Sequence, residues 1–465
     1  MSDALSNESK APAWRCWLVA IALLPVSVNI GPYVMPKGKE LNLAPLDLLI
    51  TPLMLLVLWD LLKRRERSLL PPLPNAAWAA MAMASFLWAT GFGKVEWARS
   101  AIGQTVLVGL CAVWAFRSLI PQASLYRRLA LLLGALMSVC FLYAVYQYIQ
   151  PRGLPLPSLE TGRFHGGGVT DVRVGGWFDM RTELAAHVAM FVPAAAAFVA
   201  LERDAMVRVF AAALGLIALC VCLYGGGVLA AGAGVLVVAG ALWILPRNPE
   251  GSPHARWWAL WLVVGLLFTA VVLLPRLPRG NDQVLVQTLS PWVKNSNGKE
   301  VASARLRRSQ AAALLLAHNQ KWRAGVGSGG YRLHIKSYYD DGGAYPTPGA
   351  SRDEEAEFDR DTHEPGSFSL VETTAVELGL PGLVFLAWVL CAWIAAAAWS
   401  FARSANPTVR LLALTALGAG VGAAVFSLFG NPLVRGVGCA WAFFMGLALA
   451  LPHLVSAKET SNQGQ

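Results

Sequence analysis

The chain has 465 residues, of which 56% are hydrophobic and only 14% are charged, and its formal net charge is +10. Soluble domains usually carry about 25% charged residues, so the composition excludes a soluble globular protein. Much of the positive charge lies in short segments beside apolar blocks, and no basic soluble domain with interleaved aromatic residues is present. We therefore expect the protein to contact membrane lipid and not to bind nucleic acid.

Apolar blocks of about 20 residues recur along the chain, and each is long enough to cross a bilayer core of ~30 Å. They predict an all-α polytopic membrane protein with about twelve transmembrane helices. The predicted spans are 16–35, 45–62, 75–93, 101–120, 129–149, 183–201, 207–224, 226–245, 257–275, 380–402, 409–428 and 434–454. The first lacks a small-residue cleavage site, so a retained helix is expected. Spans seven and eight are joined only by Gly225, Gly226 and Gly227, which predicts a tight helical hairpin.

Basic residues follow the second, fourth, sixth, eighth and tenth spans. They are Lys63, Arg64, Arg65, Arg67, Arg117, Arg127, Arg128, Arg203, Arg208, Arg247, Arg256, Arg403 and Arg410. The positive-inside rule places such loops in the cytoplasm. Because the number of predicted spans is even, both termini are expected there too.

Two predicted outer loops are long, at about 150–182 and 276–379. They divide the chain into an N-terminal transmembrane bundle (1–275), a large outer loop between helices nine and ten (276–379), and C-terminal helices with a cytoplasmic tail (380–465). Long loops tend to carry function, so the candidate residues are sought there.

The first outer loop combines arginines with glycines. Arg163 precedes three glycines, Arg173 precedes Gly175 and Gly176, and Arg181 stands at the entry to span six. A guanidinium pairs bidentately with phosphate, and glycines let a ligand approach the backbone. Interfacial snorkelling and ordinary turn chemistry are the alternative explanation.

The second outer loop contains a basic amphipathic stretch. Arg305, Arg307 and Arg308 precede the apolar residues 311–317, and a glycine-rich segment, 325–330, follows. An arginine clamp on a lipid-linked diphosphate is one hypothesis. The other is a helix lying in the membrane interface, with its apolar face toward lipid. The glycines follow no predicted strand, so they are not a dinucleotide fingerprint.

His363 lies among carboxylates, and Glu372 and Glu377 stand at the mouth of span ten. A base at the membrane surface could accept the proton of a hydroxyl group. The alternatives are a solvated acidic loop over 353–357 and a divalent-cation site. No ligand spacing is diagnostic of a cation, so no metal is expected.

Four stretches together resemble the O-antigen ligase and O-antigen polymerase superfamily, bacterial inner-membrane glycosyltransferases of the GT-C type. They are 43–49, 173–179 with 184–185, 305–327, and His363 with 377–383. Three departures are visible. Residues 223–227 lack the family's mid-chain arginine, residues 179–181 replace its Asn/Asp-Pro-Asn with Asp-Met-Arg, and His363 lies about five residues farther from Glu377 than the family spacing.

The resemblance implies glycan transfer from undecaprenyl diphosphate to a glycan or lipid A core hydroxyl on the periplasmic face, without a cofactor. The diphosphate-binding residues would be Arg173, Arg181, Arg305 and Arg308. His363 or Glu377 would assist deprotonation. A ligase, a repeat-unit polymerase and a protein O-glycosyltransferase all remain open. A transporter is the alternative from another class, although charged residues gather in loops and at span ends, which favours surface chemistry.

Overall fold

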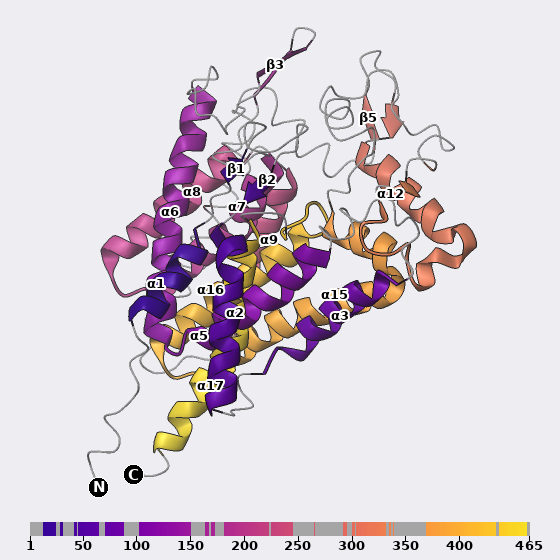
Figure 1. Ribbon diagram of the computed structural model, residues 1–465. Helices are drawn as coiled ribbons and strands as arrows, with labels where there is room; N and C mark the ends of the chain where they lie inside the picture. Colours follow the sequence, from indigo (N-terminus) through magenta and orange to yellow (C-terminus); the bar gives the residue numbers. More distant parts are fainter. Residues whose placement is uncertain are drawn as a thin grey trace.

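The computed structural model describes residues 13–24, 28–30, 41–43, 45–64, 70–87, 102–149, 163–166, 169–172, 181–222, 225–244, 265, 292–294, 300–302, 304–331, 334–335, 338, 369–433 and 437–462. In this part of the chain the fold is overwhelmingly helical (Figure 1). Strands occur here as three two-stranded antiparallel pairs: β1 (Val28–Ile30) with β2 (Leu41–Leu43), β3 (Arg163–Gly166) with β4 (Val169–Val172), and β5 (Trp292–Lys294) with β6 (Glu300–Ala302).

Seven described helices are long and apolar enough to cross a membrane: α2 (Pro45–Arg64), α6 (Ala123–Ile149), α7 (Arg181–Leu201), α9 (Gly225–Ile244), α15 (Leu370–Arg403), α16 (Pro407–Phe426) and α17 (Val437–Asn462). Shorter elements are α1 (Ala13–Ala22), α3 (Leu73–Ser85), the π-helical η3 (Gln104–Ala112) continuing into α5 (Val113–Leu119), α8 (Ala205–Val221), α12 (Ala304–Ala317) and the 3-10 helix η6 (His318–Arg323). The prediction of a membrane-embedded, polytopic helical protein is confirmed at this level.

Helix α7 is the centre of the bundle. Ninety-four per cent of its apolar window is buried, and α8, α9 and α16 pack against it. Its Pro193 ring lies between Gly234 of α9 and Gly418 of α16, where a methyl group on either glycine would collide with it. Small residues let helix backbones approach closely, which is the main source of helix association in lipid.

Three sequence expectations need correction. The first predicted span, 16–35, is not one helix, because α1 ends at Ala22 and residues 28–30 form a strand. Pro25 explains this, since its ring cannot continue a helix. The three glycines 225–227 are the first residues of α9 rather than a linker. Helix α15 begins ten residues before the predicted start of span ten. The predicted ninth span, 257–275, lies outside the described residues apart from Gly265.

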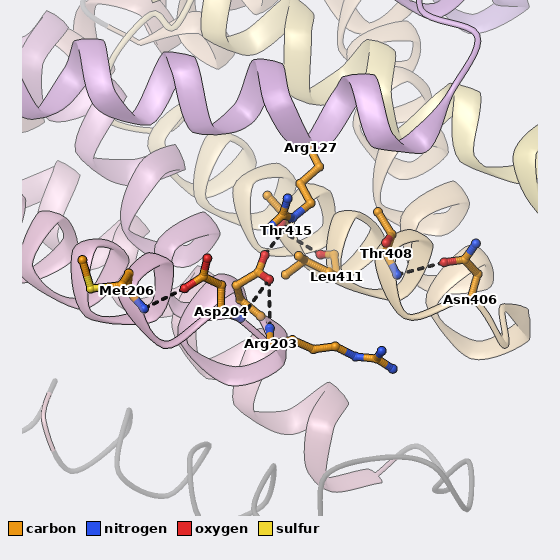
Figure 2. A network of polar contacts seen from close by, with 9 residues as sticks. Arg127, Arg203, Asp204, Met206, Asn406, Thr408, Leu411 and Thr415 are labelled. Carbon is orange, nitrogen blue, oxygen red and sulfur yellow. Dashed lines mark hydrogen bonds and ion pairs between the residues drawn. The ribbon is translucent and has the colours of Figure 1, made fainter.

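Several of the predicted basic connections that the structure describes lie at one end of the bundle. Arg117, at the end of α5, donates to the carbonyl oxygen of Leu70 at 2.9 Å and lies 2.8 Å from His453 near the end of α17. Figure 2 shows Arg127 of α6 reaching the α7–α8 connection, with Asn406 at the start of α16 close by. Helix α12 lies at the opposite end from the C-terminal end of α17 (Figure 1). The connections that carry Arg117, Arg127 and Arg203 are therefore separated from α12 by the length of the bundle.

An ion pair ties two of these connections together. Nε of Arg127 donates to Oε2 of Glu202 at 2.9 Å, and Oε1 of Glu202 accepts the backbone N–H groups of Arg203 and Asp204. Burial disfavours the charged carboxylate, but these hydrogen bonds outweigh it and hold the pKa of Glu202 below its ordinary value. The side chain of Asp204 caps α8 by accepting from the N–H of Met206.

We expect Glu202→Gln to lower the thermal unfolding midpoint at pH 7. A depressed folded-state pKa contributes stability above the unfolded pKa of about 4.3, and this contribution is lost as the pH falls through the folded value. The wild-type and variant curves should therefore converge as the pH falls below about 4.3. Melting in detergent across this range measures it, with Asp204→Asn, an equally good cap, as the matched control. Parallel curves at all pH values would contradict the assignment.

Candidate functional site

The glycine-rich segment after η6 forms a tight loop, residues 324–330, called here the glycine loop. Gly325, Gly327 and Gly329 have φ values of +75°, +91° and +76°. Only glycine adopts such values without steric cost, so the sequence pattern is required by the turns themselves. The loop ends at Tyr331, whose side chain is 2% exposed.

The glycine loop binds helix α15 where that helix is interrupted. Gly379 has φ +65° and ψ −160°, a conformation available essentially only to glycine. Pro381 has no N–H, so the carbonyl of Glu377 lacks its ordinary helical donor four residues on. The N–H of Gly327 donates to this carbonyl at 2.9 Å, and the N–H of Val326 donates to that of Val376 at 2.9 Å. The loop thus supplies hydrogen bonds that the kinked helix cannot make internally.

Two carboxylates flank Tyr331 at this junction. Its hydroxyl donates to Oε1 of Glu372 at 2.6 Å, and its backbone N–H lies 3.5 Å from Oε1 of Glu377. Glu377 is 7% exposed, whereas Glu372 is only partly buried. Tyr331 therefore links the two carboxylates that the sequence placed at the mouth of span ten.

A serine pair ties the glycine loop to α3. The hydroxyls of Ser328 and Ser85 lie 2.6 Å apart, and both residues are buried. The backbone N–H of Ser328 also donates to the hydroxyl of Ser85 at 3.0 Å, and the Ser328 hydroxyl donates to the carbonyl of Ala82 at 3.1 Å. The loop is thereby fixed against two helices whose residues are far apart in the chain.

The apolar face of α12 packs on protein. Ala311, Ala312 and Leu315 are buried against Val326, Tyr331, Ile335 and Val376. The alternative that this face lies against lipid does not hold for these three residues, while Leu314 is 50% exposed. The glycine loop and α15 supply the apolar surface against which α12 packs.

The predicted site residues are only partly placed. Glu377 lies at the loop–helix contact, and Arg305 and Arg308 belong to α12, which is packed beside it. Arg181 is the first residue of α7. The side chains of these three arginines, and Arg173 and His363 altogether, lie outside the described residues. Among the described residues, no group of three or more His, Cys, Asp or Glu could hold a metal ion.

A second polar group lies on the central helix and was not singled out from the sequence. His187 is fully buried and Glu183 is 5% exposed, one helical turn apart near the start of α7. Nδ1 of His187 lies 2.9 Å from the carbonyl oxygen of Glu183, so Nδ1 carries the proton. The ring stacks on Phe191. A Glu and a His spaced by four in an apolar segment were the signal that could have indicated it.

No protein-family model matches the chain, and no curated protein is similar to it in sequence.

Proposed function

We propose that this chain is an inner-membrane glycan transferase of the O-antigen ligase and polymerase type. It transfers an oligo- or polysaccharide from undecaprenyl diphosphate to a sugar hydroxyl on the periplasmic face. One observation carries the proposal. Two separate stretches of the resemblance, 305–327 and 377–383, meet through the hydrogen bond from the N–H of Gly327 to the carbonyl of Glu377.

The proposed topology has both termini in the cytoplasm and residues 276–379 in the periplasm. The end that collects Arg117, Arg127 and Arg203 is assigned to the cytoplasm by the positive-inside rule. The junction of α12, the glycine loop and α15 then faces the periplasm. Undecaprenyl diphosphate presents its headgroup at this interface, within reach of a helix lying beside the membrane.

The proposed chemistry is a displacement at the anomeric carbon. Arg173, Arg181, Arg305 and Arg308 are proposed to hold the diphosphate, whose charge grows as the C–O bond breaks. The acceptor hydroxyl forms the new glycosidic bond and loses its proton to His363 or a carboxylate such as Glu377. Neither a nucleotide nor a metal takes part. An acceptor on lipid A core makes the protein a ligase, and an acceptor on a second lipid-linked glycan makes it a polymerase.

A polysaccharide-related transporter is the second candidate, and the buried Glu183 and His187 favour it. Ionisable side chains inside a membrane span are costly and mark transport pathways as well as catalytic sites. A transporter would depend on this pair, whereas the proposed transferase depends on the arginines of α12.

We expect deletion of the gene to abolish capped core, O-chain or exopolysaccharide on gels, with accumulation of undecaprenyl-linked glycan. Complementation with Arg305→Ala should reduce product about 100-fold, the effect of losing a group that stabilises transition-state charge. Complementation with His363→Ala tests whether the histidine or a carboxylate accepts the proton. Arg203→Ala, at the opposite end of the bundle, is the matched control and should restore the product fully.

Other outcomes contradict the proposal. Unchanged polysaccharides and unchanged lipid-linked precursors in the deletion strain would overturn glycan transfer. If Arg305→Ala and His363→Ala both complement fully while His187→Phe does not, the transporter becomes the supported function.

A further inference from the structure

Glu372 is held from several elements at once. Its Oε1 accepts from the hydroxyl of Tyr331 at 2.6 Å, and the hydroxyl of Ser309, on α12, lies 3.5 Å from Oε2. Its backbone N–H donates to Oγ of Ser369, the N-cap of α15, at 3.2 Å. The bond from Tyr331 is short, as expected for a hydrogen bond to an ionised carboxylate. A negative charge is also favoured in the first turn of a helix.

Glu377 stands in a different environment five residues later. Its backbone carbonyl accepts from Gly327, its carboxylate lies 3.5 Å from the N–H of Tyr331, and it is 7% exposed. A methyl group on Gly325 would collide with that carbonyl, which shows how closely the loop covers it. A sugar hydroxyl could reach Glu377 only by displacing the glycine loop, whereas Glu372 is partly exposed.

The contact of Ser309 with Glu372 brings the basic end of α12 to the same place. Residues 305 and 308 precede Ser309 by four and one positions on this helix, a rise of about 6 Å or less along its axis. Residues four apart also share a helix face. In a direct displacement the incoming hydroxyl and the leaving diphosphate oxygen lie on opposite faces of one anomeric carbon. A base and a diphosphate site must therefore flank a single sugar ring, and the contact of α12 with Glu372 brings the two near enough to do so.

We propose that Glu372 is the general base of the transfer, an inference that rests on the function proposed above. The acceptor oxygen bonds to the anomeric carbon as the bond from that carbon to the diphosphate oxygen breaks. The diphosphate leaves with the bonding electron pair, and the hydroxyl proton passes to the carboxylate of Glu372 and then to water. Glu377 is a positioning residue that fixes the glycine loop, and Tyr331 orients Glu372.

The test uses full-length protein in detergent and lipid-linked glycan extracted from the deletion strain, with release of undecaprenyl diphosphate as the readout. Glu372→Gln should lower kcat by about 100-fold or more, which is the contribution of a positioned base. The kcat of Glu372→Asp should lie between those of wild type and Glu372→Gln. Arg203→Ala, in the connection between α7 and α8, is the control and should stay within threefold of wild type. Monodisperse elution establishes that each variant is folded.

Tyr331→Phe supplies a readout that a structural role would not move. The hydroxyl of Tyr331 orients the carboxylate that takes the proton and does not bind the glycan donor, so Tyr331→Phe should lower kcat while the KM for the lipid-linked glycan stays unchanged. The backbone N–H of Tyr331 keeps its place beside Glu377 in this variant, so a fall in kcat alone reports on Glu372.

The outcomes separate the two proposals. If wild-type protein releases no undecaprenyl diphosphate, the proposed function fails. If wild type is active and Glu372→Gln keeps activity within threefold, the function stands and the assignment of Glu372 is overturned. If Glu372→Gln does not elute as folded protein, an unchanged kcat in Tyr331→Phe overturns the assignment instead.

Discussion

Gly422→Ala is expected to destabilise the bundle by about 3 kcal/mol, at the upper end of the usual cost of overpacking. Pro193 of α7 has no N–H, so the carbonyl of Ala189 lacks its ordinary helical donor. Gly422 of α16 approaches this carbonyl so closely that a methyl group at Gly422 would overlap the oxygen. The neighbouring atoms belong to helix backbone, and α7 is enclosed by other helices, so neither partner can move aside cheaply.

Thermal unfolding in detergent measures this effect, and α9 offers a matched control. A methyl group at Gly240 would meet nothing within 4 Å. Because alanine is a better helix former than glycine, Gly240→Ala should leave the unfolding midpoint unchanged or slightly raised. Equal midpoints for Gly422→Ala and Gly240→Ala would show that α7 and α16 do not pack as described.

Gly379→Ala is expected to detach the glycine loop from α15 and to cost about 3 kcal/mol. Alanine pays a backbone cost at φ +65° and ψ −160°. Its methyl group would also lie 2.7 Å from the nitrogen of Gly325 and 2.8 Å from the carbonyl oxygen of Trp322. These are backbone atoms, so the loop itself must move, and the hydrogen bonds of Val326 and Gly327 should be lost.

Amide hydrogen exchange reports this directly, whatever reaction the protein catalyses. The N–H groups of Val326 and Gly327 should exchange much faster in Gly379→Ala than in wild type, while amides inside α7 stay protected. Gly215→Ala on α8 is the control, because its methyl group would lie at an ordinary 3.5 Å from Ala195. Unchanged protection at Val326 and Gly327 would contradict the role assigned to Gly379.

The contact between the glycine loop and α15 explains why Glu372 and Glu377 differ in exposure. Glu372 and Glu377 looked equivalent in the sequence, since both stand just before an apolar span. In the structure, the kink at Gly379 turns the carbonyl of Glu377 toward the glycine loop, while Glu372 meets Tyr331 and Ser309. One residue is covered by backbone and the other is accessible from outside.

Composition and hydrophobic block length were sufficient to predict a helical membrane protein, because a bilayer requires apolar segments of about 20 residues whose backbone groups are satisfied internally. They also predicted α2, α7, α8, α9 and α16 to within a few residues. The glycines at 325, 327 and 329 were visible as a turn-forming segment. These properties depend on residues that are neighbours in the sequence, so they can be predicted without the tertiary structure.

Only the tertiary structure decided which stretches meet. The sequence did not indicate that α7 would be enclosed, that His187 would be fully buried, or that Ser328 would bond to Ser85, 243 residues away. Nor did it indicate that the apolar face of α12 would rest on protein instead of lipid. An apolar helix face can be covered by protein or by lipid. Which of the two covers α12 depends on the surface formed by the kink at Gly379 and by the carbonyls before Pro381. That surface exists only after residues 325–331 and 372–381 have come together.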